Sequence, residues 1–277
     1  MHTLETLDPA TIKHFGLRDD PFAPPATPDE MHLPGTLVAF ETRLETAIRR
    51  RGIVALTGPA GAGKSTITRR LWGRCARQQK IRLISPAIED RRKITHTVLG
   101  IAILRDLLKR ETASYSAEAR SDLLRTTLRE RQEEGEYPVL VIDEAHHLSI
   151  QGLLAVKHLW DSHTLFRQLA VIMVGQPLLA ARLRSDPALA EVGGRTEILE
   201  LRPYRANEVR DYLAWRLKRV GAELSEVFDD AAISAIALSA RFPLWINNTA
   251  AAALTNAHAV SDRRVTAAHV RAAGGAS

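Results

Sequence analysis

Short apolar segments alternate along the chain with longer segments whose apolar residues recur at helical spacing. Compact runs of Val, Ile and Leu are typical of buried strands, and apolar residues three and four positions apart are typical of helices. The pattern predicts strands at residues 52–58, 81–87, 138–145 and 168–177, with a candidate fifth at 196–204. Helices are predicted at residues 64–79, 93–110, 116–134 and 150–166. This alternation indicates an α/β fold with a parallel sheet covered on both faces.

The same pattern divides the chain into three parts. Residues 1–45 are expected to form an extended N-terminal lead-in, because residues 19–35 hold five prolines, which disfavour helix. The α/β core is expected at residues 46–202. Residues 203–277 show only helical spacing and predict a small helical domain. The expected N-terminal caps of its helices are Asn207, Asp229 or Asp230, and Thr266.

Composition indicates a chain that works in a reducing, aqueous compartment. Of the 277 residues, 45% are hydrophobic, which is enough for a substantial core. No apolar run approaches the roughly 18–20 residues of a membrane span, and the N-terminus does not resemble a secretory signal. A single cysteine, Cys75, excludes an internal disulfide. We therefore expect a cytoplasmic protein that does not enter a membrane.

Positive charge is concentrated in one stretch of the sequence. Residues 49–110 hold sixteen Lys or Arg against three acids, whereas the remaining residues hold 22 against 29. The isoelectric point is about 9.8. This asymmetry predicts a basic face that binds a polyanion, although charged helix surfaces that face only solvent have a similar composition.

The sequence Gly58–Ser65, GPAGAGKS, fits the pattern G-x-x-x-x-G-K-[ST] at every position. It follows a predicted strand and opens a predicted helix, as a phosphate-binding loop requires. The glycines of such a loop let backbone amides curl around phosphate oxygens at a helix N-terminus. The pattern predicts a nucleoside triphosphate with Mg²⁺, in which Lys64 neutralises the β- and γ-phosphates and Ser65 binds the metal. The nucleotide-contacting residues would be Gly58, Pro59, Ala60, Gly61, Ala62, Gly63, Lys64, Ser65 and Thr66.

The segment Val139–Ser149, VLVIDEAHHLS, ends an apolar strand in two carboxylates and two histidines. A phosphate-loop enzyme needs an acid near Mg²⁺ and a group that prepares the attacking water, both at the end of a buried strand. This need favours Asp143 as a Mg²⁺ ligand and Glu144 as the group that orients water.

Two other interpretations of this segment are weaker. A transition-metal site of Asp143, Glu144, His146 and His147 lacks the helical H-E-x-x-H spacing, and neighbouring histidines do not easily share one ion. The letters D-E-A-H also occur in helicases, but those enzymes need two tandem motor domains, far more chain than this sequence has. The two histidines are expected to begin the next helix, where either could sense the nucleotide or a partner.

With VIMVGQP and the helical C-terminal part, these motifs give a chain that resembles AAA+ ATPases. The order and spacing are similar to the branch that contains ExeA, TnsC, TniB and MuB, on the segments HFGLRDDPFAPPATPDEMHL, VGQPLLAARL, LELRPYRANEVRDYLAWRLKRVG and RFPLWINN. The resemblance implies an ATPase that uses ATP and Mg²⁺, with an AAA+ core and a C-terminal helical lid domain. It also implies a homo-oligomer, either a ring or a helical filament.

The resemblance assigns further roles along the chain. Gln176 ends the fourth predicted strand, where the family has its first sensor of the γ-phosphate. Arg195 lies where the family has an arginine finger for the ATP of the neighbouring subunit, with Arg182 and Arg184 as alternatives. A finger of this kind is worth about 10³–10⁵ in rate.

The chain departs from the family at its second sensor. Where the family often has a Pro-Arg pair, this sequence has Pro243–Leu244. Arg241, three positions before Leu244, is the candidate replacement. We therefore expect slow ATP turnover.

The resemblance leaves open what the ATPase acts on. One hypothesis is a regulator of DNA transposition that oligomerises on duplex DNA and recruits or activates a transposase, with or without a target-selection factor. Related transposition ATPases present DNA-contacting residues just after the second strand, and Lys and Arg without interleaved aromatics favour contacts to the DNA backbone over sequence reading. The alternatives are a secretion-assembly ATPase similar to ExeA and a nucleotide-gated signalling switch. The candidate DNA contacts are Arg91, Arg92, Lys93 and Thr95.

Overall fold

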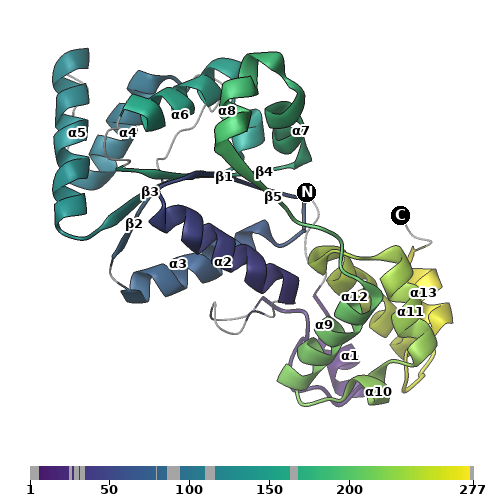
Figure 1. Cartoon of the computed structure of the whole chain (residues 1–277). Helices are drawn as coiled ribbons and strands as arrows, with labels where there is room; N and C mark the ends of the chain where they lie inside the picture. Colours follow the sequence, from purple (N-terminus) through teal and green to yellow (C-terminus); the bar gives the residue numbers. More distant parts are fainter. Residues whose placement is uncertain are drawn as a thin grey trace. The chain divides into compact units, whose positions relative to one another are not determined.

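The computed structural model describes residues 6–24, 27, 31, 35–78, 80–85, 94–109, 116–162 and 168–274. The chain divides into two compact units, and each is described by itself (Figure 1). The α/β unit comprises Thr36–Ala60 and Lys64–Leu201. The helical unit comprises Met1–Gly35, Gly61–Gly63 and Arg202–Ser277.

The α/β unit is built on a five-stranded, all-parallel sheet with the strand order β2-β3-β4-β1-β5. β1, β2 and β4 lie inside the segments predicted as strands, and β3 begins one residue before its predicted segment. The fifth candidate, 196–204, is confirmed in its first part. The strands are β1 Ile53–Thr57, β2 Ile81–Ile84, β3 Tyr137–Ile142, β4 Ala170–Gly175 and β5 Thr196–Glu200.

Helices cover both faces of this sheet, which confirms the predicted α/β layering. Figure 1 shows α2 and α3 on one face and α4, α6 and α8 on the other. Because neither face of β1 or β4 meets water, every residue of both strands is buried, and their sequences are continuously apolar rather than alternating. The helices are α2 Gly35–Arg49, α3 Lys64–Gln78, α4 His96–Leu108, α5 Ala117–Glu133, α6 Ile150–Ser162, α7 Pro177–Ser185 and α8 Ala190–Arg195.

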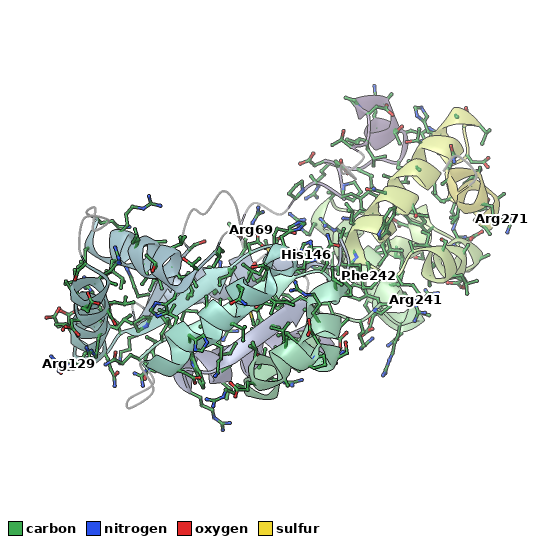
Figure 2. The ribbon with its side chains drawn as sticks, turned by 90° about the horizontal axis from the view of Figure 1, so that it is seen from above. Arg69, Arg129, His146, Arg241, Phe242 and Arg271 are labelled. Atoms are coloured by element: carbon green, nitrogen blue, oxygen red, sulfur yellow. The ribbon has the colours of Figure 1, made fainter. Side chains whose placement is uncertain are left out.

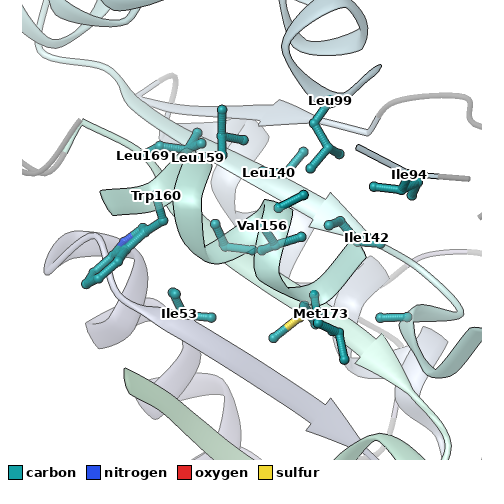
Figure 3. Packing of buried hydrophobic residues seen from close by; sticks show 14 of the residues in the cluster. Ile53, Ile94, Leu99, Leu140, Ile142, Val156, Leu159, Trp160, Leu169 and Met173 are labelled. Atoms are coloured by element: carbon teal, nitrogen blue, oxygen red, sulfur yellow. The ribbon is translucent and has the colours of Figure 1, made fainter. Parts of the chain in front are cut away.

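One large apolar cluster lies between the sheet and the helices α4 and α6 (Figure 3). Leu140 of β3 and Met173 of β4 are fully buried in it, together with Leu99 of α4 and Val156 of α6. Truncation of such a leucine to alanine typically costs about 2–5 kcal/mol, because both the transfer energy and the packing around the lost atoms are forfeited. The cluster therefore fixes the strands whose ends carry the candidate site.

The helical unit contains α9 Ala206–Arg219, α10 Leu224–Val227, α11 Asp230–Ser239, α12 Pro243–Ala259 and α13 Ala267–Gly274. The N-terminal segment is part of this unit and is tied to it by hydrogen bonds. The hydroxyl of Thr11 lies 2.9 Å from Nδ1 of His258, and buried Arg216 donates to the carbonyl of Ala23 at 2.9 Å. The described N-terminal residues thus do not form a separate extended arm.

The lead-in, predicted to be extended, contains one helix and the start of another. Pro9–His14 forms α1, and α2 begins at Gly35. The carboxylate of Asp8 accepts the backbone N–H groups of Ala10 and Thr11, both at 2.9 Å, and proline occupies the first helical position. Proline at that position loses no intrahelical hydrogen bond. Pro9 lies outside the proline-rich residues 19–35, so those five prolines could not predict the conformation of α1.

The predicted caps of the helical unit have mixed outcomes. Asp229 is confirmed, since its carboxylate accepts the N–H of Ala232 at 2.6 Å. Asn207 is wrong, because α9 begins after Arg205, whose backbone N–H donates to the Glu208 carboxylate at 2.8 Å. The glutamate at the third helical position thus reaches back to the N–H of the residue that precedes the helix.

Candidate nucleotide-binding site

The carboxyl ends of three neighbouring strands bring the candidate residues to one edge of the sheet. β4 lies between β1 and β3, with Thr57 opposite Gly175 and Ile142 opposite Met173. The phosphate loop therefore follows β1, Gln176 follows β4, and the two acids follow β3, all on the same side. Crevices at the carboxyl ends of parallel strands are where open α/β sheets bind ligands.

The phosphate loop has the backbone that its glycines permit. Gly61 and Gly63 have φ of 75° and 96°, a region that residues with a side chain rarely adopt. The N–H of Gly58 donates to the carbonyl of Gly175 at 3.2 Å, which ties the start of the loop to β4. Ser65 lies exposed in the first turn of α3, where its hydroxyl can bind a metal.

Lys64 and the two acids belong to one electrostatic site. The Lys64 ammonium donates to the carbonyls of Gly58 at 2.7 Å and Pro59 at 2.9 Å, so it lies over the loop. Burial lowers the pKa of Lys64, and the charges of Glu144 and Asp143 oppose that effect. The two sequence motifs thus meet in space, as predicted from their positions after strands.

Asp143 and Glu144 lie at the turn where β3 ends. The carboxylate of Asp143 is exposed and accepts the N–H of Glu144 at 2.9 Å. Hydroxyl and carboxylate oxygens are the hard ligands that Mg²⁺ takes, so Ser65 and Asp143 suit the metal that accompanies ATP. Glu144 has φ of 54°, and its side chain is 44% exposed, which leaves it accessible to water.

The turn after Glu144 is the short 3-10 helix η3, Ala145–His147, so the two histidines do not begin α6 as predicted. His146 is buried, and its Nδ1 lies 3.4 Å from the Glu144 carboxylate and accepts the N–H of Gln176 at 3.4 Å. Burial and the neighbouring His147 lower the pKa of His146. The His146 ring therefore lies between the Glu144 carboxylate and the backbone N–H of Gln176.

Three ligand atoms of Glu144, His146 and His147 lie within 4.8 Å of one another. The two imidazole rings are adjacent, with their centroids 4.0 Å apart. The sequence spacing argues against a transition-metal site, whereas in the structure η3 brings both rings near the Glu144 carboxylate. Asp143 is not a member of this group.

Gln176 caps the start of α7 directly after β4, and its side chain is exposed. Its position beside the phosphate loop follows from the pairing of Gly175 with Thr57. Its role as a sensor stays a prediction.

The three arginines considered as fingers differ in their surroundings. Arg182 of α7 donates to the carbonyls of Leu148 at 2.6 Å and His146 at 3.4 Å, so it braces the turn of its own chain. Arg184 pairs with a carboxylate of β5. Arg195 ends α8, is about half exposed, and pairs with Asp161 at 2.7 Å. The bracing role of Arg182 was missed, because no local pattern signals a contact across more than thirty residues.

Arg241, the candidate second sensor, has its contacts inside the helical unit. Its Nε donates to the carbonyl of Tyr204 at 3.0 Å, and the N–H of Tyr204 donates back to the carbonyl of Arg241 at 2.7 Å. Figure 2 labels Arg241 and the adjacent Phe242 in the helical unit and His146 in the α/β unit. This bond to Tyr204 gives Arg241 a structural role.

The predicted DNA contacts fall mostly outside the described residues. Arg91, Arg92 and Lys93 are not among the residues that the structure describes. Thr95 is described, and its hydroxyl oxygen accepts the N–H of Val98 at 3.3 Å as the N-terminal cap of α4. This capping bond is sufficient to explain why a threonine precedes α4.

Comparisons with known proteins agree with this arrangement. Residues 47–183 match the family model described as an AAA domain. This segment contains the phosphate loop, both acids and Gln176. Residues 47–183 are thus similar to AAA domains, and the chain has an AAA+ ATPase fold that binds ATP with Mg²⁺. No curated protein matches the sequence.

Solved structures share the fold over nearly the whole chain. Cdc6p from Pyrobaculum aerophilum is 21% identical with a TM-score of 0.62, covering 92% of this chain and 70% of its own. The ORC2 protein of Aeropyrum pernix, in ADPNP-ADP complexes, is 14% identical with a TM-score of 0.58, and the coverage is the same. The A. pernix ORC1 protein in complex with DNA is 19% identical with a TM-score of 0.56, covering 92% and 68%. Within the described residues, every helix is too short or too polar to cross a membrane.

Proposed function

We propose that the chain is an ATP-dependent, sequence-nonspecific DNA-binding regulator of DNA transposition. ATP-bound subunits assemble on duplex DNA, as a ring or helical filament, and recruit or activate a transposase. This setting is cytoplasmic. The observation that carries the proposal is an AAA domain with a phosphate loop and two acids at a strand end, in the same chain as the basic stretch 49–110.

Two further observations support a DNA partner. The A. pernix ORC1 protein, which shares the fold, was solved in complex with DNA. The basic stretch includes cations that the structure places at the surface, among them Arg50, Arg69 and Lys80. Cations that contact phosphates supply affinity without sequence preference, which suits a protein that marks DNA for a transposase.

In the proposed cycle, the described residues divide the work. Lys64 and the loop amides hold the phosphates, and Glu144 orients the water. Mg²⁺, held by Ser65 and Asp143, would neutralise charge on the transferred phosphoryl group. Gln176 reads the γ-phosphate, and Arg195 completes the site of the neighbouring subunit. Assembly follows ATP binding, and hydrolysis releases the subunits.

The test is the Glu144→Gln variant with duplex DNA and ATP. Loss of the water-orienting carboxylate should lower ATP hydrolysis by about 10²–10⁴-fold while ATP binding is retained. The variant should therefore remain on DNA in assemblies visible by electron microscopy, long after the wild-type assemblies have dissociated.

The matched control is Glu223→Gln, an exposed acid of the helical unit, which should behave as wild type. Normal hydrolysis by Glu144→Gln would show that the water-orienting group is wrong. If ATP-bound assemblies of the variant form equally well without DNA, the ATPase assignment would stand and the proposed DNA partner would be rejected.

A further inference from the structure

Glu144, His146 and His147 offer a carboxylate and two imidazoles from one turn of the chain. Two histidines and a glutamate are a known ligand set for Zn²⁺, with a fourth position open to water. The Glu144 carboxylate is 44% exposed and His147 is exposed, so an ion can reach the group from solvent.

The distance between the first two ligands suits one tetrahedral ion. Nδ1 of His146 lies 3.4 Å from Oε2 of Glu144. Two ligands at the usual zinc bond lengths are about 3.4 Å apart at a tetrahedral angle. The third ligand atom, from the exposed His147, lies within 4.8 Å of the others.

The backbone of the group is held in place before any ion arrives. The N–H of His147 donates to the carbonyl of Glu144 at 3.0 Å, and that of Leu148 donates to Ala145 at 3.1 Å. Arg182 binds the carbonyl of Leu148 at 2.6 Å. A braced turn loses little conformational entropy when it binds, which favours affinity.

The charges around the group are mixed. Nδ1 of His146 accepts the N–H of Gln176, so this nitrogen presents a lone pair that a metal ion can use. Its only described partner at Nδ1 besides Glu144 is the Gln176 N–H at 3.4 Å, long for a hydrogen bond, so an ion displaces little. Lys64 opposes a cation, and the carboxylates of Asp143 and Glu144 offset it.

We propose that Glu144, His146 and His147 form an inhibitory Zn²⁺ site in the ATPase centre. The ion holds the carboxylate that otherwise orients water, so hydrolysis stops while the nucleotide stays bound. The inhibition rests on the proposed role of Glu144, but the binding of Zn²⁺ does not.

Binding is measured first, on the full chain without nucleotide. We expect the protein to compete with a chromogenic chelator for one Zn²⁺ per chain. Co²⁺ bound in place of Zn²⁺ should show the intense visible absorption of tetrahedral coordination. His147→Ala should weaken the ion by at least about 10- to 100-fold, the loss that removal of an outer-shell partner already causes. His158→Ala, an exposed histidine of α6, is the matched control and should bind as wild type.

Inhibition is measured second, at saturating Mg²⁺ and ATP. Zn²⁺ should abolish hydrolysis by wild type and by His158→Ala, and a chelator should restore it. The rate of His147→Ala, compared with its own rate without Zn²⁺, should not change when Zn²⁺ is added. Equal inhibition of His147→Ala would overturn the proposal, because the ion would then act elsewhere. If His147→Ala loses Zn²⁺ binding but Zn²⁺ does not inhibit the wild type, the metal site would stand and the proposed role of Glu144 would be rejected.

Discussion

The conformation of Glu144 shapes the candidate site at the scale of single residues. A φ of 54° is uncommon for a residue with a side chain and costs of order 1–3 kcal/mol. This conformation ends β3 abruptly and starts η3, which brings His146 back to within 3.4 Å of the carboxylate. A strand continued through this position would have carried the acid and the histidine apart.

Lys64 provides the residue-scale prediction. The Lys64→Ala variant should bind ATP roughly 10- to 150-fold more weakly, because a charge-assisted bond to phosphate contributes about 1.5–3 kcal/mol. Isothermal titration with a non-hydrolysable ATP analogue measures the change. Lys80→Ala, an exposed lysine just before β2, is the control and should bind normally. Equal affinities for both variants would remove Lys64 from the site.

At the scale of elements, what the sequence predicts depends on how local the signal is. The strands and most helices follow from apolar periodicity, and the phosphate loop follows from eight consecutive residues. The order β2-β3-β4-β1-β5 is not a local property, nor is the bond from Arg182 to η3. These depend on which segments meet after folding. The shared site of Asp143 and Lys64 could be predicted, because both residues follow buried parallel strands, but the contact of Arg182 with η3 could not.

The link between α7 and η3 gives the prediction at this scale. Removal of the Arg182 guanidinium frees two carbonyls of the turn that carries Glu144, so Arg182→Ala should lower kcat about tenfold or more with little change in KM for ATP. Lysine should rescue only in part, because it lacks the planar fork. Arg184→Ala, on the same helix, is the control.

Steady-state ATPase kinetics with thermal unfolding separate this role from simple destabilisation. If Arg182→Ala loses melting temperature but keeps kcat in the folded state, Arg182 supports only the fold. If KM rises and kcat is unchanged, the turn does not position the catalytic carboxylate.

At the scale of the whole molecule, the uneven charge predicts how the protein meets DNA. Each phosphate contact that is removed should reduce the slope of log K against log salt by about 1. The combined change of Arg91, Arg92 and Lys93 to Ala should therefore flatten that slope by up to about 3 and weaken binding alike for unrelated sequences. Fluorescence anisotropy over a salt series measures both effects.

The control removes as many charges outside the basic stretch, at Arg125, Arg129 and Lys218, all exposed. It should keep the wild-type slope. If both triple variants lose affinity equally, the net charge of the protein determines the affinity for DNA, and the segment after β2 makes no specific contribution. An unchanged slope in the first variant would place the contacts elsewhere.

Assembly of subunits makes a second prediction at this scale, for Arg195. The Arg195→Ala variant should fold, because it loses one half-exposed ion pair with Asp161 and a contact with the Trp160 ring, while Lys157 still pairs with Asp161. Its ATPase activity should fall by about 10³-fold or more if the arginine completes a neighbour's site.

Mixing the Arg195→Ala variant with Glu144→Gln should restore activity, because each Arg195→Ala subunit keeps its own Glu144 and receives Arg195 from the partner. Arg182→Ala mixed with Glu144→Gln should show no recovery, since Arg182 braces its own chain. Recovery in the second mixture and none in the first would exchange the roles of the two arginines.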